Sequence, residues 1–166
     1  MDENDLLDVV DENDKVIGQD YKEKKFQQGF ISRNATVLVK DKQNKFIIVK
    51  RSPLKRTHPN KLDISVCGNV NSGESYEEAA KREMKEELNI DCEIKFLRKV
   101  FNHFQEKEMD LKYFTGLFLA NYDGEVQTNE EIQEYHKFTL QEIEERIKQD
   151  PDSFTPGFRH DFQEIK

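Results

Sequence analysis

Three glutamates in the middle of the chain have the spacing of one helix face: Glu83, Glu86 and Glu87 lie three and four residues apart. Like charges at this spacing repel one another, and a bound divalent cation removes that repulsion. Carboxylate oxygens are the ligands that hard cations such as Mg²⁺ prefer. A solvated acidic face is the alternative, because 36% of the residues are charged. The spacing therefore raises metal binding as a hypothesis that needs further support.

Local signals place these glutamates on a helix that begins after Ser75 and ends at Asn89. Ser75 is followed three residues later by Glu78, which is the arrangement of a capping box. Asn89 tolerates the left-handed conformation that ends many helices. Gly68 and Gly73 precede the helix and let the backbone pass close to a metal ion or a phosphate. A core-facing stripe recurs every four residues at Tyr76, Ala80, Met84 and Leu88.

The stretch from Gly68 to Ile90 resembles the Nudix box, whose signature is Gly-x5-Glu-x7-Arg-Glu-U-x-Glu-Glu-x-Gly-U, with U a bulky aliphatic residue. Every defined position is matched except the last glycine, which is Asn89 here. The resemblance implies a single Nudix hydrolase domain over residues 1–166, with the box at 68–90. It also implies an α/β fold, an α/β/α sandwich with a mixed sheet, and metal-dependent hydrolysis of a diphosphate linkage in a nucleoside-diphosphate-X type of substrate.

The same resemblance implies roles for residues of the box. The metal, Mg²⁺ or Mn²⁺, is expected on Glu83, Glu86 and Glu87, and Glu74 is expected to join the metal site or to support the loop. Arg82 is expected to hold the glutamates in place through a bidentate salt bridge that lysine cannot make. Glu83, Glu86 and Arg82 are therefore the expected catalytic residues within the box.

A further carboxylate often acts as the general base in this family, and residues 128–138 supply the candidates. Glu130, Glu131 and Glu134 resemble the acidic segment common after the box, and we prefer Glu131. An acidic strand edge is the alternative interpretation of this segment.

Basic residues gather just before the glycine-containing loop, at Lys50, Arg51, Lys55, Arg56, His58 and Lys61. This cluster predicts a clamp for substrate phosphates, with Arg51 and Lys55 as binding residues and Gly68 close to the phosphate. A solvated basic loop explains the same pattern, and the sequence does not separate the two interpretations.

A narrower resemblance links the N-terminal two-thirds to the isopentenyl-diphosphate isomerase branch of the Nudix superfamily. The matching pieces are residues 11–18, 29–33, 49–55, 59–63 and 65–68. In those isomerases a cysteine at the position of Cys67 is catalytic and histidines hold the metal, but this chain has Asn69 and Ser32 where the histidines are expected. We therefore predict a hydrolase and a core-packing role for Cys67. An isomerase and a non-catalytic nucleotide-binding module remain the alternatives.

Length and composition bound the remaining interpretations. A chain of 166 residues fits one domain. A net charge of −8 and a pI near 5.1 argue against duplex nucleic acid and anionic membranes as partners. Two cysteines, the lack of an 18-residue apolar run and an N-terminus without signal-peptide features predict a reduced, cytoplasmic protein. The expected partner is a small-molecule diphosphate, and a homodimer stays open because dimers are common in the family.

Hydrophobic patterning predicts the elements around the box. Short β-rich runs joined by polar turns predict two hairpins, one over 6–18 and one over 35–50. Further strands are expected at 62–67, 92–101, 111–120 and 132–138, and further helices at 140–148 and 158–166.

Overall fold

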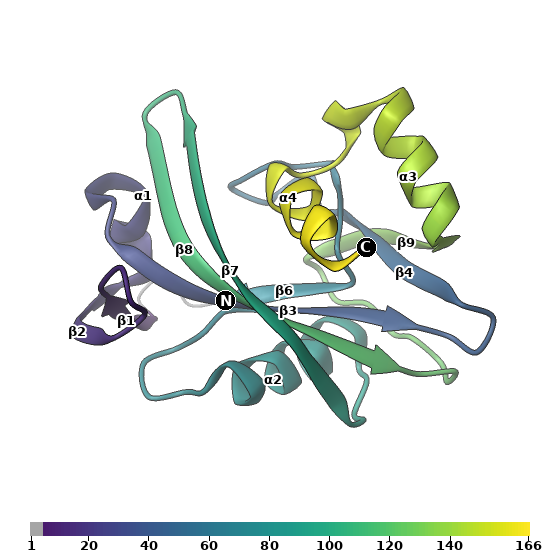
Figure 1. The fold of residues 1–166 in the computed structure, drawn as a ribbon, viewed down its shortest axis with the longest axis horizontal. Coiled ribbons are helices and arrows are strands. Elements are labelled where there is room, and N and C mark those ends of the chain that lie inside the picture. The colour runs from purple at the N-terminus through teal and green to yellow at the C-terminus, as the bar shows by residue number, and fades with distance from the viewer. Residues whose placement is uncertain (1–4) are drawn as a thin grey trace.

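A nine-stranded mixed sheet with helices on both faces forms the frame of the molecule (Figure 1). The computed structural model describes residues 5–166, apart from the side chains of residues 27 and 28. Helix α2 covers one face of the sheet, and helices α3 and α4 lie on the other (Figure 1). This arrangement confirms the predicted α/β/α sandwich.

The elements follow the predicted order, with differences in their bounds. The strands are β1 Leu6–Val10, β2 Val16–Tyr21, β3 Ile31–Lys40, β4 Lys45–Arg51, β5 Leu62–Asp63, β6 Val66–Asn69, β7 Ile94–Glu106, β8 Met109–Asn121 and β9 Ile132–Thr139. The helices are α1 Lys25–Gln28, α2 Tyr76–Leu88, α3 Leu140–Gln149 and α4 Pro156–Ile165, with short 3-10 turns at Lys22–Lys24 and Pro151–Ser153.

Strand β3 is the centre of the sheet. It pairs in parallel with β8 along its whole length and antiparallel with β6, where Ala35 lies opposite Gly68 and Thr36 opposite Cys67. The predicted hairpin over 35–50 is confirmed in its two strands, its turn and one antiparallel pair, Lys40 with Phe46, but the pairing between β3 and β4 extends no further. The reason is competition, because β6 and β8 occupy both edges of β3 while β4 pairs with β9.

The strand predicted over 62–67 is split into β5 and β6 by a break at Ser65. The Ser65 hydroxyl donates to the carbonyl of Ile47 and accepts from the amide of Val39, so it links β4 to β3 where these strands separate. This split lets β5 pair with β4 and lets β6 pair with β3.

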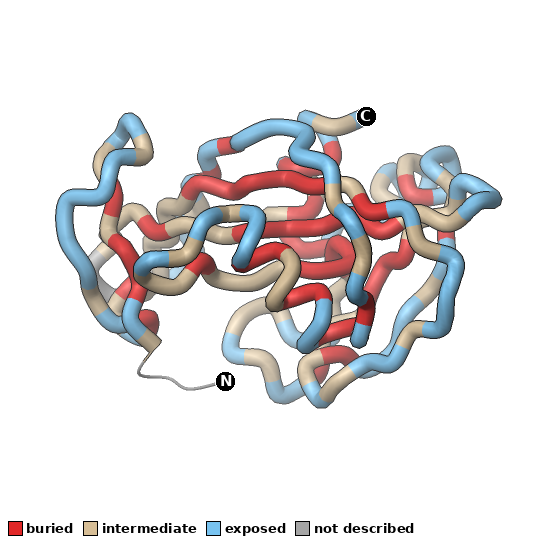
Figure 2. Tube along the Cα trace, turned by 90° about the horizontal axis from the view of Figure 1, so that it is seen from below, coloured by how far each residue is buried: buried red, intermediate tan, exposed pale blue. Residues whose placement is uncertain are grey.

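The sheet separates two hydrophobic cores, and the buried strands between them run through the middle of the molecule (Figure 2). Ala35, Val37 and Val39 of β3 face the core beneath α2. Leu38 faces the second core, which α3 and α4 cover, and Asn34 and Thr36 share its side of the strand because side chains alternate. The second face of β3 is thus polar near its start.

Helix α2 begins and ends where the sequence predicts. The Ser75 side chain accepts from the backbone N–H of Glu78, and Asn89 adopts the left-handed conformation with φ 55°. Ala80, Met84 and Leu88 are buried in the core beneath the helix, and Tyr76 packs against it. These contacts fix the rotation of α2 and hence the direction of its glutamates.

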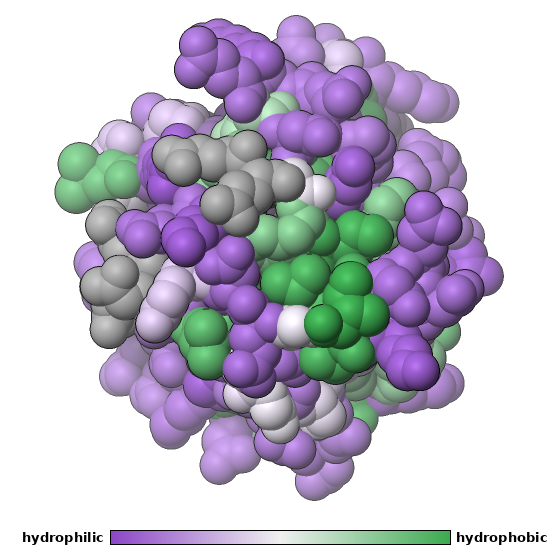
Figure 3. All heavy atoms as spheres, turned by 90° about the vertical axis from the view of Figure 1, so that its left-hand side faces the viewer, coloured by the Kyte–Doolittle hydropathy of each residue, from purple (hydrophilic) through white to green (hydrophobic). Residues whose placement is uncertain are grey.

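The surface matches the charged composition of the chain. The face at the β1–β2 end is mostly hydrophilic, with one group of hydrophobic side chains near its centre (Figure 3). Among residues 5–166, no helix is long and apolar enough to cross a membrane.

Candidate active site

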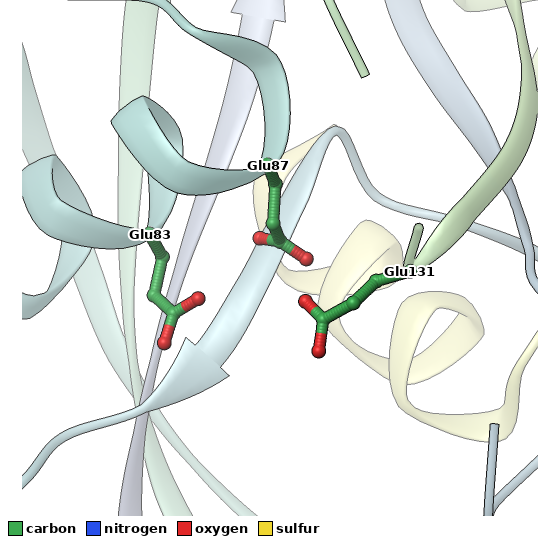
Figure 4. Close-up of side chains that lie close together, drawn as sticks. All are labelled: Glu83, Glu87 and Glu131. Atoms are coloured by element: carbon green, nitrogen blue, oxygen red, sulfur yellow. The ribbon is translucent and has the colours of Figure 1, made fainter. Parts of the chain in front are cut away.

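Three carboxylates converge at one end of strand β6 (Figure 4). Glu83 and Glu87 lie one turn apart on α2, and Glu131 comes from the loop before β9. One oxygen of each lies within 4.8 Å of the others, and both α2 side chains are buried. Burial raises the pKa of both α2 carboxyls, and the neighbouring carboxylates raise them further. The three carboxylates repel one another when ionised, and their oxygens are the ligands that a hard divalent cation prefers.

Arg82 organises the loop and the helix around this group. Its guanidinium donates two hydrogen bonds to the Glu74 carboxylate, at 2.6 and 2.9 Å, and one of 2.7 Å to Glu83. A further bond of 2.9 Å reaches the carbonyl of Asn69 at the end of β6. These bonds raise the pKa of Arg82, so its charge is permanent. The side chain therefore fixes the Glu83 carboxylate against the loop.

The structure separates the four predicted metal ligands. Glu83 and Glu87 meet, whereas Glu86 lies at the rim with more than half of its side chain exposed, 3.6 Å from Arg82. Glu86 still lines a small hollow of about 120 Å³ that Glu83 and Glu131 also line. Both oxygens of Glu74 accept from Arg82, and one also accepts from the backbone N–H of Asn71. Glu74 thus supports the loop. Glu131, which the sequence offered only as a candidate base, lies in the group of possible metal ligands.

The other two candidates for the base lie outside the group. Glu134 is exposed and lies 3.7 Å from Lys50, its partner across the β4–β9 pairing. Glu130 is exposed, although it lines the adjoining cavity. The preference for Glu131 stays a prediction, and its position in the group supports it.

A cavity of about 450 Å³ adjoins the carboxylates and is lined by both Glu83 and Glu131. Its walls come from the segment 22–26, the loop 51–58, strands β3, β6 and β8, and helix α4. This volume falls in the range of about 300–1,000 Å³ that small-molecule sites occupy.

The two predicted phosphate-binding side chains have different surroundings. Lys55 lines the cavity with its ammonium 3.3 Å from Glu131, so it lies beside the carboxylate group. Arg51 also lines the cavity, but all three of its nitrogens donate to protein acceptors. Those acceptors are the carbonyl and hydroxyl of Thr57 and the carboxylate of Asp63. These bonds fix Arg51 to the loop, and its predicted contact with a phosphate stays a prediction.

Two cavity-lining lysines were missed by the sequence interpretation. Lys22 and Lys25 are both buried and line the cavity. Burial, followed by the charge of Lys22, lowers the pKa of Lys25 to about 7. The Lys25 ammonium donates a hydrogen bond of 2.7 Å to the side-chain oxygen of Asn69. Asn69 is the residue that stands where an isomerase histidine is expected. The run of basic residues at 22–25 was the available signal, and α1 is too short to show helical periodicity.

Cys67 lines the cavity and packs partly against the second core. Its backbone N–H lies 3.3 Å from Glu87 and donates to that carboxylate. Burial raises the pKa of its thiol well above the usual value, so the neutral thiol is the stable form. Ser32, at the other expected histidine position, is a buried residue of β3.

The family model of the NUDIX domain matches residues 31–158, which include the box, most of the cavity walls and Glu131. The chain belongs to the Nudix family. An uncharacterized Nudix hydrolase of Nostoc sp. is 42% identical over 95 residues, covering 57% of this chain and 56% of the relative. The chain thus spans little more than half the length of that relative.

Two further relatives align with nearly the whole chain. Isopentenyl-diphosphate Delta-isomerase 2 of Photorhabdus laumondii is 29% identical, covering 96% of this chain and 90% of the relative. A prenyl-diphosphate phosphatase of Methanosarcina mazei is also 29% identical, with coverages of 93% and 91%. The crystal structure of DR0079 from Deinococcus radiodurans superimposes with a TM-score of 0.73 at 30% identity, covering 87% and 90% of the two chains.

Proposed function

We propose that this Nudix protein is a metal-dependent pyrophosphohydrolase that cleaves the diphosphate linkage of a nucleoside-diphosphate-X substrate. The observation that carries the proposal is the convergence of Glu83, Glu87 and Glu131 beside a cavity lined by lysines. Carboxylates without cations would repel a diphosphate, and lysines without carboxylates would bind it without the means to cleave it.

The donor set fits Mg²⁺ or Mn²⁺, because every candidate ligand is a carboxylate oxygen. Glu83, Glu87 and Glu131, with Glu86 at the rim, are the side chains that would hold the ion. When bound, such an ion polarises a phosphoryl oxygen and offsets charge that develops during hydrolysis.

The protein side chains supply positioning and proton transfer. Lys25 and Lys55 attract the diphosphate, and Arg82 keeps the Glu83 carboxylate in place. Glu131 lies at the border of the carboxylate group and the cavity, where it can accept a proton from an attacking water. Lys55, at 3.3 Å, orients the Glu131 carboxylate.

The deciding experiment is a substrate panel assayed with Mg²⁺, Mn²⁺ or EDTA, with released phosphate and pyrophosphate measured. The panel contains nucleoside triphosphates, dinucleotides, nucleotide sugars and isoprenoid diphosphates. We expect metal-dependent turnover of a nucleotide that Glu87→Gln reduces by orders of magnitude. Glu93→Gln, at an exposed position, is the matched control and retains full turnover. Equal turnover in Glu87→Gln and the parent would refute the assignment.

An isomerase is the second candidate, and the alignment with an isopentenyl-diphosphate isomerase over 96% of the chain favours it. That reaction also needs a thiol in the cavity, and Cys67 supplies one. Incubation with isopentenyl diphosphate and Mg²⁺ tests this candidate. Formation of the allylic isomer, abolished in Cys67→Ala, would replace the hydrolase proposal. A non-catalytic nucleotide-binding module would instead bind nucleotides without turnover of any member of the panel.

A further inference from the structure

One largely buried wall of the cavity carries polar groups that the proposed hydrolysis leaves unused. Asn34 and Thr36 of β3, Thr115 of β8 and Asp161 of α4 line it, and we call these four residues the polar wall. Asn34 lies opposite Thr115 in the parallel β3–β8 pairing, and Thr36 follows on the same side of the strand. Thr36, Thr115 and Asp161 are at most 3% exposed.

Asp161 is held so that one oxygen is engaged with the protein. The Asn102 amide donates to Asp161 Oδ1 at 3.2 Å and to the Thr115 hydroxyl at 3.0 Å. The oxygen of Asn102 is in turn 2.7 Å from His160 Nδ1, which fixes the orientation of the amide. Asp161 Oδ2 has no hydrogen-bond partner among the described residues. The protein therefore holds one oxygen of Asp161 and leaves the other oxygen without a partner among these residues.

Two more atoms of the wall lack partners. The Thr36 hydroxyl and the side-chain oxygen of Asn34 are buried and form no hydrogen bond with any described residue. Buried polar groups are nearly always satisfied, so a polar partner at this wall, water or ligand, would be favoured. A hydrocarbon chain would displace water here without replacing its hydrogen bonds, whereas a polar ligand would satisfy them.

The positions of the charged and aromatic side chains narrow the range of ligands that the cavity could bind. The lysines of the cavity are Lys22, Lys25 and Lys55, near the carboxylate group, whereas the polar wall contains no basic side chain to bind a phosphate. Tyr113 and Phe104, whose rings are 6.3 Å apart, lie beside the wall and offer aromatic faces. A flat ring with polar edges suits this combination, since aromatic side chains stack on nucleobases regardless of sequence.

We infer that the polar wall binds the base of the nucleotide substrate, with Asp161 and Thr36 hydrogen-bonding to its edge. The inference rests on the proposed function for the placement of the diphosphate at the carboxylate end. Asp161 and Thr36 are thus specificity-determining residues, and the polar wall selects a heterocyclic base over an isoprenoid chain.

The test measures binding without turnover, by calorimetric titration with Mg²⁺ present. The probes are the α,β-methylene diphosphates of four nucleosides, inorganic pyrophosphate, and the non-hydrolysable methylene analogue of an isoprenoid diphosphate. The parent is compared with Thr36→Val, Asp161→Asn and the control Asp152→Asn, whose position is exposed. Melting temperatures of all proteins are recorded alongside.

We expect the parent to bind one nucleoside analogue at least tenfold more tightly than pyrophosphate or the isoprenoid analogue. Asp161→Asn should weaken that binding 10- to 100-fold and Thr36→Val about threefold to tenfold, and neither should change pyrophosphate binding by more than twofold. Thr36→Val should melt no lower than the parent, because its hydroxyl has no protein partner to lose.

Three results would overturn the inference: tighter binding of the isoprenoid analogue, unchanged nucleoside binding in both variants, or equal losses for nucleoside and pyrophosphate. Failure of the proposed function is a separate observation. Base-selective binding without metal-dependent turnover in the substrate panel would refute hydrolysis and leave the base site standing. Metal-dependent turnover without base selectivity would refute the base site and leave the proposed hydrolysis standing.

Discussion

The Glu83 carboxylate lies where a side chain on Gly68 would be. A Cβ atom built on Gly68 would lie 2.1 Å from the carboxyl carbon of Glu83, closer than any real contact. Strand β6 therefore passes directly against the carboxylate of a proposed ligand, and only the missing side chain of glycine allows it. The backbone conformation does not require glycine here, since Gly68 does not have a positive φ. Glycine is needed because any side chain would clash with the Glu83 carboxylate.

Replacing Gly68 by alanine should displace the Glu83 carboxylate from the group of three. We expect kcat to fall at least 100-fold with Mg²⁺ present, and more Mg²⁺ to be needed for half-maximal activity. Gly18→Ala is the matched control, because no atom lies within 4 Å of a Cβ built there. Steady-state kinetics over a Mg²⁺ titration decide the matter, and normal activity in Gly68→Ala would show that Glu83 is not a ligand.

Arg82 should not tolerate lysine. Its guanidinium bonds to Glu74, Glu83 and the Asn69 carbonyl at once, and a single ammonium cannot reach all three. We expect Arg82→Lys to lower kcat about 10- to 100-fold, as loss of a residue supporting metal ligands does. Arg98→Lys, which alters an exposed pair with Glu164, should match the parent. If both lysine variants keep the parental kcat, then the positive charge at position 82 is sufficient and the guanidinium geometry is not needed.

The repulsion among the buried carboxylates predicts opposite effects of one substitution on stability and on metal response. Glu87→Gln removes a carboxyl group whose ionised form is disfavoured by burial and by Glu83 and Glu131, so without metal at pH 8 the variant should melt a few degrees higher than the parent. Added Mg²⁺ should raise the melting temperature of the parent and raise that of the variant much less. Differential scanning fluorimetry with and without Mg²⁺ measures both. A variant that melts lower without metal, or gains as much from Mg²⁺, would contradict the site.

The box and its helix were predictable because their signals are local. Capping at Ser75 and Asn89 and the four-residue stripe depend on neighbours within one helix, and these expectations are confirmed. The strands were predicted but too short at the hairpin: β7 continues to Glu106 and β8 begins at Met109, within the largely polar segment 102–110. Main-chain pairing does not require apolar side chains, and His103 bonds to Asp110 across the hairpin at 2.6 Å.

The rest of the site depends on contacts between distant segments, which a single sequence does not reveal. The sequence favoured Glu131 over Glu130 as a candidate base, but it did not predict that Glu131 lies beside Glu83 and Glu87. The basic cluster at 50–61 was visible, but the commitment of Arg51 to Thr57 and Asp63 was not. Asp161 left a weak trace, as an acid between Phe158 and Phe162 on the apolar side of a predicted helix.

Asp161 should make the stability of the protein depend on pH. Burial raises its pKa from 3.8 to about 7, against the opposing hydrogen bond from Asn102, and the nearby charges of Asp63 and Glu164 add to the rise. His160 Nδ1 lies 3.9 Å from Asp161 Oδ1, and the titratable side chains of Cys67 and Tyr113 also interact electrostatically with Asp161. Between pH 4 and 7 the folded protein therefore holds a proton on Asp161 that the unfolded chain has lost.

A proton held only by the folded state means that the free energy of unfolding falls as pH rises through that window. In Asp161→Asn this contribution is absent, so the variant should gain on the parent between pH 4 and 8, by at most about 4 kcal/mol. Urea unfolding at pH 5, 6, 7 and 8 measures the difference, and Asp152→Asn should run parallel to the parent. The same pH slope in Asp161→Asn and the parent would mean that Asp161 stays ionised in the fold, and it would then offer the base of a nucleotide only acceptors.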